Sequence, residues 1–116
     1  MTMLARIEAE RRGGVAIARV LGEVDASNTD WLGTRLRALV TNRSDALAVD
    51  MRGTTYLDSA GIALIFELAG ELRLHQQQLY LVVEEGSPIA RMVHLTGLDD
   101  AVSIAWSLEA ALGDDA

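Results

Sequence analysis

The segment Ala46–Met51 is apolar on both of its faces until Asp50, and this pattern restricts the fold more than any other part of the sequence. A strand that alternates polar and apolar residues can lie at a surface, but one that is apolar throughout must be covered on both sides. Such strands are typical of parallel sheets that lie between layers. We therefore expect a layered α/β protein with this strand inside it.

Around this segment, strand and helix patterns alternate along the chain. Strand patterns over Leu4–Glu10 and Val15–Leu21, separated by Arg11–Gly14, predict an opening hairpin. Further strands are predicted at Leu79–Val83 and Ala101–Ile104. Because strands joined through helices require right-handed crossovers, the sheet should be mostly parallel beyond the hairpin, with helices covering at least one face.

Helix signals fill the connections between these strands. Ser27 or Asn28 can cap a first helix, whose apolar stripe is Leu32, Leu36, Leu39 and Val40. A later helix begins at Ser87-Pro88, and a last one covers Trp106–Leu112. The 116 residues fit one domain, 1–116, with an ordered core over roughly residues 4–112. The predicted fold is one mixed, mostly parallel sheet of about five strands, opened by the hairpin, with about four helices.

The stretch from Tyr56 to Gly70 joins a short apolar segment to a helix, and the two patterns meet at Asp58 and Ser59. Either side chain can cap the helix by accepting hydrogen bonds from first-turn N–H groups, where the helix dipole adds positive potential. A hydroxyl at this point is presented on a rigid element, and the site would tolerate a phosphate. Taken alone, the Asp-Ser pair indicates only an N-cap.

The helix that begins near Ser59 is predicted to have one face of core residues and one line of small, exposed residues. Ala63 and Gly70 lie near the line that runs down from Ser59, so the surface below Ser59 should be smooth. Leu64 and Leu68 widen the apolar arc, which indicates either more core or a docking face. The core stripe is expected to consist of Ile62, Ile65, Phe66, Ala69 and Leu72.

Composition limits the partners and the chemistry. The formal charge of -7 disfavours nucleic acid and anionic membranes, which bind clustered positive charge. Lysine and cysteine are both absent, which excludes a lysine or thiol nucleophile and cysteine-ligated zinc in this chain. No apolar run is long enough to cross a bilayer, so we expect a cytoplasmic protein without membrane insertion.

Catalytic and metal sites have little support. A nucleophile elbow needs a glycine two residues before the serine, where this chain has Leu57, although Gly61 fits the motif. His75 lies about 24 Å from Ser59 along the same helix, at 1.5 Å per residue. His94 is the other histidine, and a lone histidine on a helix is more often structural. We therefore expect no catalytic residue, no metal and no cofactor.

Two segments resemble the signature stretches of STAS domains, specifically those of bacterial anti-sigma-factor antagonists. They are Gly22–Asp25 with Asn28, and Leu57–Gly61, whose Asp-Ser-Ala-Gly sequence stands at the predicted strand-to-helix junction. The resemblance covers nearly the whole chain and includes Leu95–Leu98. Val24 is a small departure, a conservative change from the aliphatic residue usually found there.

The resemblance implies a phosphorylation switch that is not itself an enzyme. Ser59 would be the phosphoacceptor for an anti-sigma factor that is a serine kinase of the GHKL type, which would supply ATP and Mg²⁺. The unphosphorylated form would bind this factor and free the sigma factor, and a serine phosphatase would be a further partner. The partner-binding surface is expected to comprise Glu23, Asp25, Asn28, Asp58, Ala60, Gly61 and Ala63.

Family resemblance leaves other assignments open. Similar domains act in stress-signalling assemblies and as small subunits of lipid-transport complexes, and either assignment suits a small cytosolic protein. Similar domains also form the tails of anion transporters, but this chain has no membrane segment that would fit such a protein. Nucleotide binding is a third hypothesis, which the sequence does not support with a phosphate-cradling glycine loop.

Overall fold

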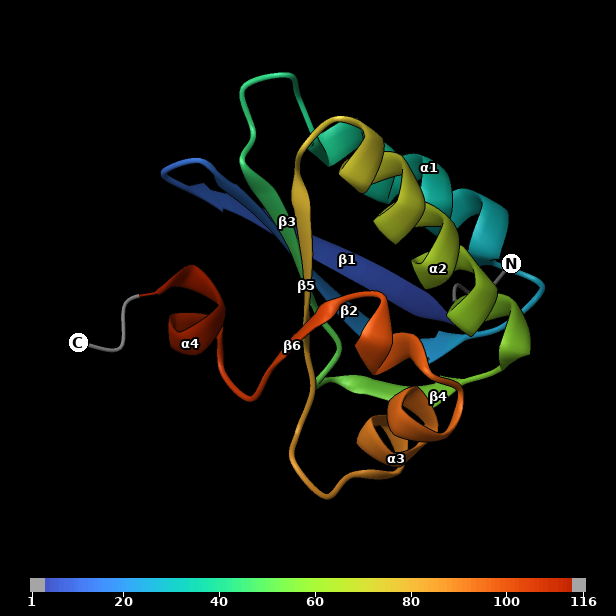
Figure 1. Ribbon diagram of the computed structural model, residues 1–116. Helices are drawn as coiled ribbons and strands as arrows, with labels where there is room; N and C mark the ends of the chain where they lie inside the picture. The colour runs from blue at the N-terminus through green and yellow to red at the C-terminus, as the bar shows by residue number, and fades with distance from the viewer. Residues whose placement is uncertain (1–3, 114–116) are drawn as a thin grey trace.

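One mixed sheet runs through the computed structural model, which describes residues 4–113 (Figure 1). Within that range its strands are β1 (Ala5–Arg12), β2 (Val15–Val24), β3 (Ala46–Asp50), β4 (Thr54–Leu57), β5 (Gln78–Val82) and β6 (Ser103–Ala105). Their spatial order is β1-β2-β3-β5-β6, and β4 pairs with β2. Only the β1–β2 hairpin among these pairs is antiparallel, which confirms the predicted mixed, mostly parallel sheet.

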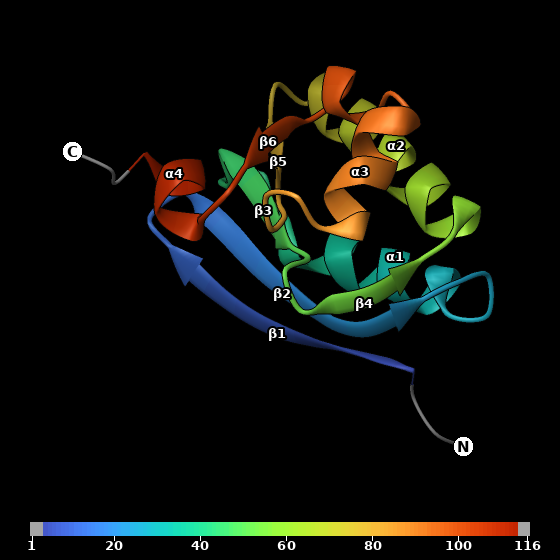
Figure 2. The same cartoon turned by 90° about the horizontal axis from the view of Figure 1, so that it is seen from below.

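Helices cover both faces of this sheet, but unequally. The elements are α1 (Thr29–Leu39), α2 (Ser59–Leu74), α3 (Pro88–Leu95), the short 3-10 helix η1 (Leu98–Asp100) and α4 (Leu108–Leu112). Helices α1, α2 and α3 lie on one face, whereas α4 lies alone on the other (Figures 1 and 2). The connection from β4 to α2 and the loop from β2 to α1 are at the same end of the sheet (Figure 2).

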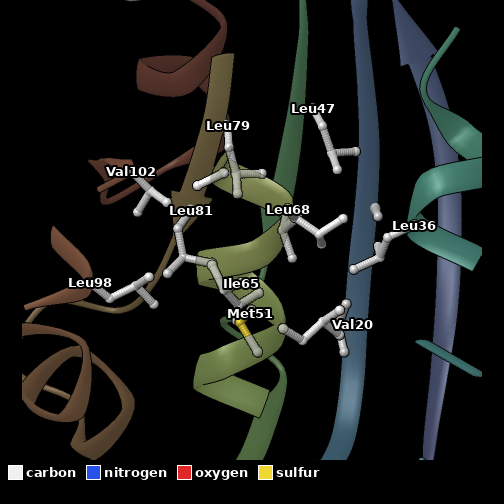
Figure 3. Packing of buried hydrophobic residues seen from close by; sticks show 14 of the residues in the cluster. Val20, Leu36, Leu47, Met51, Ile65, Leu68, Leu79, Leu81, Leu98 and Val102 are labelled. Carbon is white, nitrogen blue, oxygen red and sulfur yellow. The ribbon is translucent and has the colours of Figure 1, made fainter. Parts of the chain in front are cut away.

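The core divides into a large cluster under α1–α3 and a small one under α4. Figure 3 shows part of the large cluster, in which Leu47 of β3 and Leu81 of β5 face Ile65 and Leu68 of α2. Ala48, the residue after Leu47, belongs to the small cluster instead. Strand β3 is thus covered on both faces, as its apolar sequence predicted. The small cluster consists of Ile17, Ala48, Val82, Ala105, Leu108 and Ala111.

Strand β4 was not predicted from the sequence. No strand was expected between Ala46–Met51 and the helix that follows Asp58, but Thr54–Leu57 pairs in parallel with the last residues of β2. Strand β3 pairs with β2 only as far as Arg19, so the remaining length of β2 is free to accept a second neighbour on the same side. The extra strand brings Leu57 next to Val24 and thereby sets where α2 begins.

On the faces of α2, the structure settles one assignment that the sequence left open and corrects another. Leu64 and Leu68 are buried, so the wide apolar arc is core and not a docking face. The cause is the neighbouring helix: a Cβ at the buried Gly33 of α1 would lie 2.9 Å from Leu64 Cδ1, so the absence of a side chain there makes room for Leu64. Phe66, by contrast, was assigned to the core and is 38% exposed.

A paired arginine joins α1 to α2 at the surface. Arg37 donates to Glu71 through Nε and Nη2, each at 2.8 Å, and its Nη2 lies 3.6 Å from Glu67 Oε2. The hydrogen bond from Arg37 holds the pKa of Glu71 below its ordinary value, and burial acts in the opposite sense. This pair fixes the outer edges of the two helices against each other.

Two helix starts follow the expected capping chemistry. Ser87 accepts a hydrogen bond from Ala90 N and caps α3, as predicted. Helix α4 begins later than expected, because Ser107 caps it by accepting from Ala110 N. Trp106 therefore lies outside the helix and is 50% exposed. Strand β6 also begins two residues later than the predicted Ala101, which lies after η1.

Arginines and carboxylates pair on the sheet face that α4 leaves open. Arg12 Nε lies 2.6 Å from Glu10 Oε1, and Arg19 Nη1 lies 3.5 Å from Glu10 Oε2. Asp50 is buried at the end of β3 and receives hydrogen bonds from the Arg52 guanidinium at 2.8 and 3.0 Å. This hydrogen bonding raises the pKa of Arg52. We call the set Arg6, Glu8, Glu10, Arg12, Arg19, Asp50 and Arg52 the strand face.

Candidate functional site

Ser59 is the first residue of α2 and is exposed. The residue before it, Asp58, has an extended backbone and occupies the N-cap position. Asp58 Oδ1 accepts hydrogen bonds from Ala60 N at 2.9 Å and from Gly61 N at 3.1 Å. The sequence left open which of the two residues caps the helix, and the structure assigns this role to Asp58. The Ser59 hydroxyl is therefore presented to solvent without being required for the cap.

The loop between β2 and α1 is held by its own side chains. Asp25 Oδ1 accepts from Ser27 N at 2.9 Å and from Ser27 Oγ at 2.5 Å. Asn28 Oδ1 accepts from Asp25 N at 3.1 Å, while its Nδ2 donates to Glu23 O at 2.8 Å. Asn28 occupies the N-cap position of α1 but makes no side-chain cap. Asp25 and Asn28 thus shape the loop, and their carboxylate and amide groups are already engaged.

Four contacts bring the end of β2 and this loop to the start of α2. Val24 is the strand partner of Leu57, and Glu23 is the partner of Tyr56. Asp58 N donates to Val24 O at 3.2 Å. Asp58 Oδ2 accepts from Ala26 N at 3.3 Å. The two stretches singled out from the sequence, although separated along the chain, therefore form one continuous surface.

The small residues after Ser59 differ in where they lie. Gly61 is buried, and a Cβ there would clash with the Leu57 side chain and lie 3.0 Å from Val24 Cγ1. Ala60 is half-buried and Ala63 is exposed. Gly61 therefore acts through close packing of α2 on the strands, whereas Ala63 is available at the surface.

An exposed apolar line continues from Ser59 along α2. Ala63 and Gly70 are both exposed, as expected, and a Cβ at Gly70 would meet no atom within 4 Å. Phe66 projects on the same side of the helix, which the sequence analysis did not recognise. Its position seven residues after Ser59, nearly two helical turns, is the signal that could have placed it there.

Tyr56 is the second surface residue that the sequence analysis did not place. It lies beside Glu23 in the β2–β4 pair and is 49% exposed. The missed strand is the reason, because alternation along β4 directs Leu57 into the core and Tyr56 away from it. Glu23 itself is exposed. Carboxylates of Glu23, Asp25 and Asp58 thus belong to the segments around Ser59 and contribute negative charge there.

The two histidines lie away from Ser59. His75 follows the last residue of α2. His94 of α3 bonds through Nδ1 to Asp99 Oδ2 at 2.9 Å, and this carboxylate raises the pKa of His94. Within residues 4–113, no group of three or more His, Asp or Glu side chains is placed to hold a metal ion. Over the same range, no helix has both the length and the apolar character needed to cross a membrane.

Together, fold and site define a class of protein: a small α/β domain that displays a serine at the start of a helix, beside a preformed loop. The sequence model of the STAS domain family matches residues 6–111. The chain therefore belongs to the STAS domain family.

Named relatives agree with this assignment. The anti-sigma-F factor antagonist RsfB of Mycobacterium tuberculosis is 29% identical over 99 residues, covering 85% of this chain and 80% of that protein. The crystal structure of an anti-sigma factor antagonist from Mycobacterium paratuberculosis matches with a TM-score of 0.84 and 25% identity, over 95% of this chain and 92% of that one.

The fold is also that of SpoIIAA, an anti-sigma factor antagonist. Its unphosphorylated form matches with a TM-score of 0.70 and 18% identity, over 94% of this chain and 96% of that one. The phosphorylated form of the Bacillus protein matches with a TM-score of 0.66 and 17% identity, over 91% of this chain and 96% of that one. At this identity the likeness concerns the fold alone.

Proposed function

We propose that this protein is an anti-sigma-factor antagonist whose binding to a kinase-type anti-sigma factor is controlled by phosphorylation of Ser59. The observation that carries the proposal is the exposed Ser59 at the start of α2, not needed as the cap and adjacent to the Asp25–Asn28 loop. A kinase can reach such a hydroxyl without unfolding any element. The names of the relatives support the regulatory class, since they are anti-sigma factor antagonists.

The unmodified protein is the binding form in this proposal. A complex centred on Ser59 removes water from that residue, and burying a phosphate there has an effective penalty of several kcal/mol unless a cation meets it. Asp58 and Asp25 belong to the same surface and add like charge. A penalty of about 3 kcal/mol weakens binding roughly a hundredfold, so phosphorylation should release the partner.

Phosphotransfer and binding test the proposal together. Purified protein is incubated with ATP, Mg²⁺ and serine kinases of the GHKL type from the native host, and its intact mass is measured. The wild type and Ser103→Ala, which removes an exposed serine from β6, should gain one phosphate, whereas Ser59→Ala should gain none. Phosphate on Ser59→Ala would place the acceptor elsewhere and overturn the assignment.

Affinity measurements then establish the direction of the switch. Unmodified protein should bind the kinase-type partner, and phosphorylated protein should bind about a hundredfold more weakly. Equal or tighter binding of the phosphorylated form would mean that arginines on the partner offset the desolvation. In that case the unmodified state would not be the active one.

A further inference from the structure

The carboxylate of Asp58 bonds to both segments of the candidate site at once. Its Oδ1 accepts from Ala60 N and Gly61 N in the first turn of α2, at 2.9 and 3.1 Å. Its Oδ2 accepts from Ala26 N in the β2–α1 loop, at 3.3 Å. A helix cap needs only the first set of bonds. The bond to Ala26 is additional, and it connects a residue next to Ser59 with a loop 32 residues earlier in the chain.

The β2–α1 loop has its own internal hydrogen bonds, so the single bond from Ala26 N to Asp58 can position it as a whole. Asp25 and Asn28 hold the loop internally through Ser27 N and Asp25 N, as described above. These bonds fix the shape of the loop but do not reach α2. The bond from Ala26 N to Asp58 Oδ2 does, and its length of 3.3 Å makes it the weakest of the three that Asp58 accepts.

We propose that Asp58 is a positioning residue that docks the Asp25–Asn28 loop against α2, and that phosphorylation of Ser59 opens this contact. The inference rests on the proposed function, since it concerns how phosphate acts at that same site. Phosphorylation changes the free protein before any partner is met: the loop leaves its docked position, and the surface offered to the partner is no longer assembled.

Competition for the same donors explains the opening. A phosphate on Ser59 carries about -1.5 to -2 charge and seeks the N–H groups of the first turn. Ala60 N and Gly61 N are already bonded to Asp58, so the two anions compete for them and repel each other. Displacement of the carboxylate breaks its weakest bond first. Ala26 is exposed, so its freed N–H bonds to water and the opening leaves no buried donor unpaired.

Nuclear magnetic resonance of the isolated protein tests this contact without any partner or kinase. Phosphoserine is introduced at position 59 during translation, and ¹⁵N relaxation is measured for the loop amides. In the phosphoprotein, order parameters of residues 25–28 should fall below those of the unmodified protein, while those of α1 stay unchanged.

Asp58→Asn provides a matched variant. An asparagine oxygen can still cap Ala60 N and Gly61 N, but its NH₂ group cannot accept from Ala26 N. The variant should keep the fold, show lower order parameters at residues 25–28 and bind the kinase-type partner about tenfold more weakly without any phosphate. Asp58→Ser, which caps the helix but is too short to reach Ala26, should behave in the same way and replaces the asparagine variant if that one does not fold.

The outcomes separate this inference from the proposed function. If residues 25–28 are equally ordered with and without phosphate, the docking role of Asp58 is wrong, even where phosphate still abolishes partner binding. If phosphate loosens the loop but no kinase-type factor binds either form, the docking role stands and the proposed function fails.

Discussion

Asp58 caps α2 and Ser59 does not, so replacing each by alanine should change the stability of the protein by different amounts. Asp58→Ala removes the acceptor for Ala60 N and Gly61 N and should lower the free energy of unfolding by about 1 kcal/mol. Ser59→Ala removes a solvent-facing hydroxyl and should change it by less than about 0.5 kcal/mol. Urea unfolding of both variants measures the difference. Equal losses would show that the hydroxyl shares the cap.

This distinction was beyond the sequence because aspartate and serine both cap helices well. The backbone decides between them: Asp58 is extended, with φ -101° and ψ -174°, while Ser59 is already helical. Asn28 illustrates the same limit. Its predicted position at the start of α1 is confirmed, but its amide bonds to Asp25 N and Glu23 O instead of to the helix. Residue type thus predicts where a helix begins more reliably than it predicts the hydrogen-bond partner of each polar side chain.

Two glycines of α2 should respond oppositely to alanine. Gly61→Ala drives a methyl group into Leu57 and against Val24, so it should destabilise the fold by about 1–3 kcal/mol. Gly70→Ala adds a methyl group in open space on the same helix and should stabilise the protein by about 0.5–1 kcal/mol. Thermal or urea unfolding compares them. A stable Gly61→Ala variant would mean that α2 can shift away from the strands.

At the scale of elements, α2 exposes the line of small residues below Ser59, and we expect a partner to bind there. Ala63→Arg should weaken binding of the kinase-type partner at least about tenfold, because the long side chain covers the smooth surface next to Ser59. Ala110→Arg places the same side chain at an exposed position on α4, across the sheet, and should bind as the wild type does. Circular dichroism confirms the fold of both. Equal binding by the two variants would remove Ala63 from the interface.

The ion pair between α1 and α2 predicts a pH dependence of stability. The pKa of Glu71 is lowered in the fold, so its pairing with Arg37 stabilises the protein at neutral pH and is lost as the pH falls through that lowered pKa. Glu71→Gln should be less stable than the wild type by at most about 1 kcal/mol at pH 7, since the pair is exposed. The difference should shrink below about pH 4. The stability difference is obtained from urea midpoints between about pH 3.5 and about pH 7, a range that includes the ordinary carboxyl titration. A difference that stays constant would assign it to packing.

Element order was predictable from the sequence, whereas contacts between elements were less so. Alternation of strand and helix patterns gave the hairpin, the parallel strands and α2. Strand β4 was missed because four residues show too little periodicity, and its pairing depends on how far β2 runs past β3. Leu64 and Phe66 were uncertain or wrong for a related reason: which side of an apolar helix is core depends on where α1 packs, as Gly33 shows.

For the molecule as a whole, phosphorylation should leave the fold in place. The modified residue is exposed, and the helix dipole offers the phosphate about 0.3–1 kcal/mol, which the nearby Asp58 opposes. The melting temperature of protein with phosphoserine at position 59 should therefore lie within about 5 °C of the unmodified value. Differential scanning calorimetry measures this. A much larger fall would show that the loop and the start of α2 are part of the cooperative core.

The strand face has a consequence for how the protein meets other molecules. Its four arginines, Arg6, Arg12, Arg19 and Arg52, stand among three carboxylates, so this face is close to neutral in a chain of formal charge -7. The excess negative charge must therefore be distributed away from it. Such an uneven distribution gives the molecule an electric dipole moment that turns it during diffusion. A positively charged protein would meet the acidic side first, and its association rate would fall with added salt.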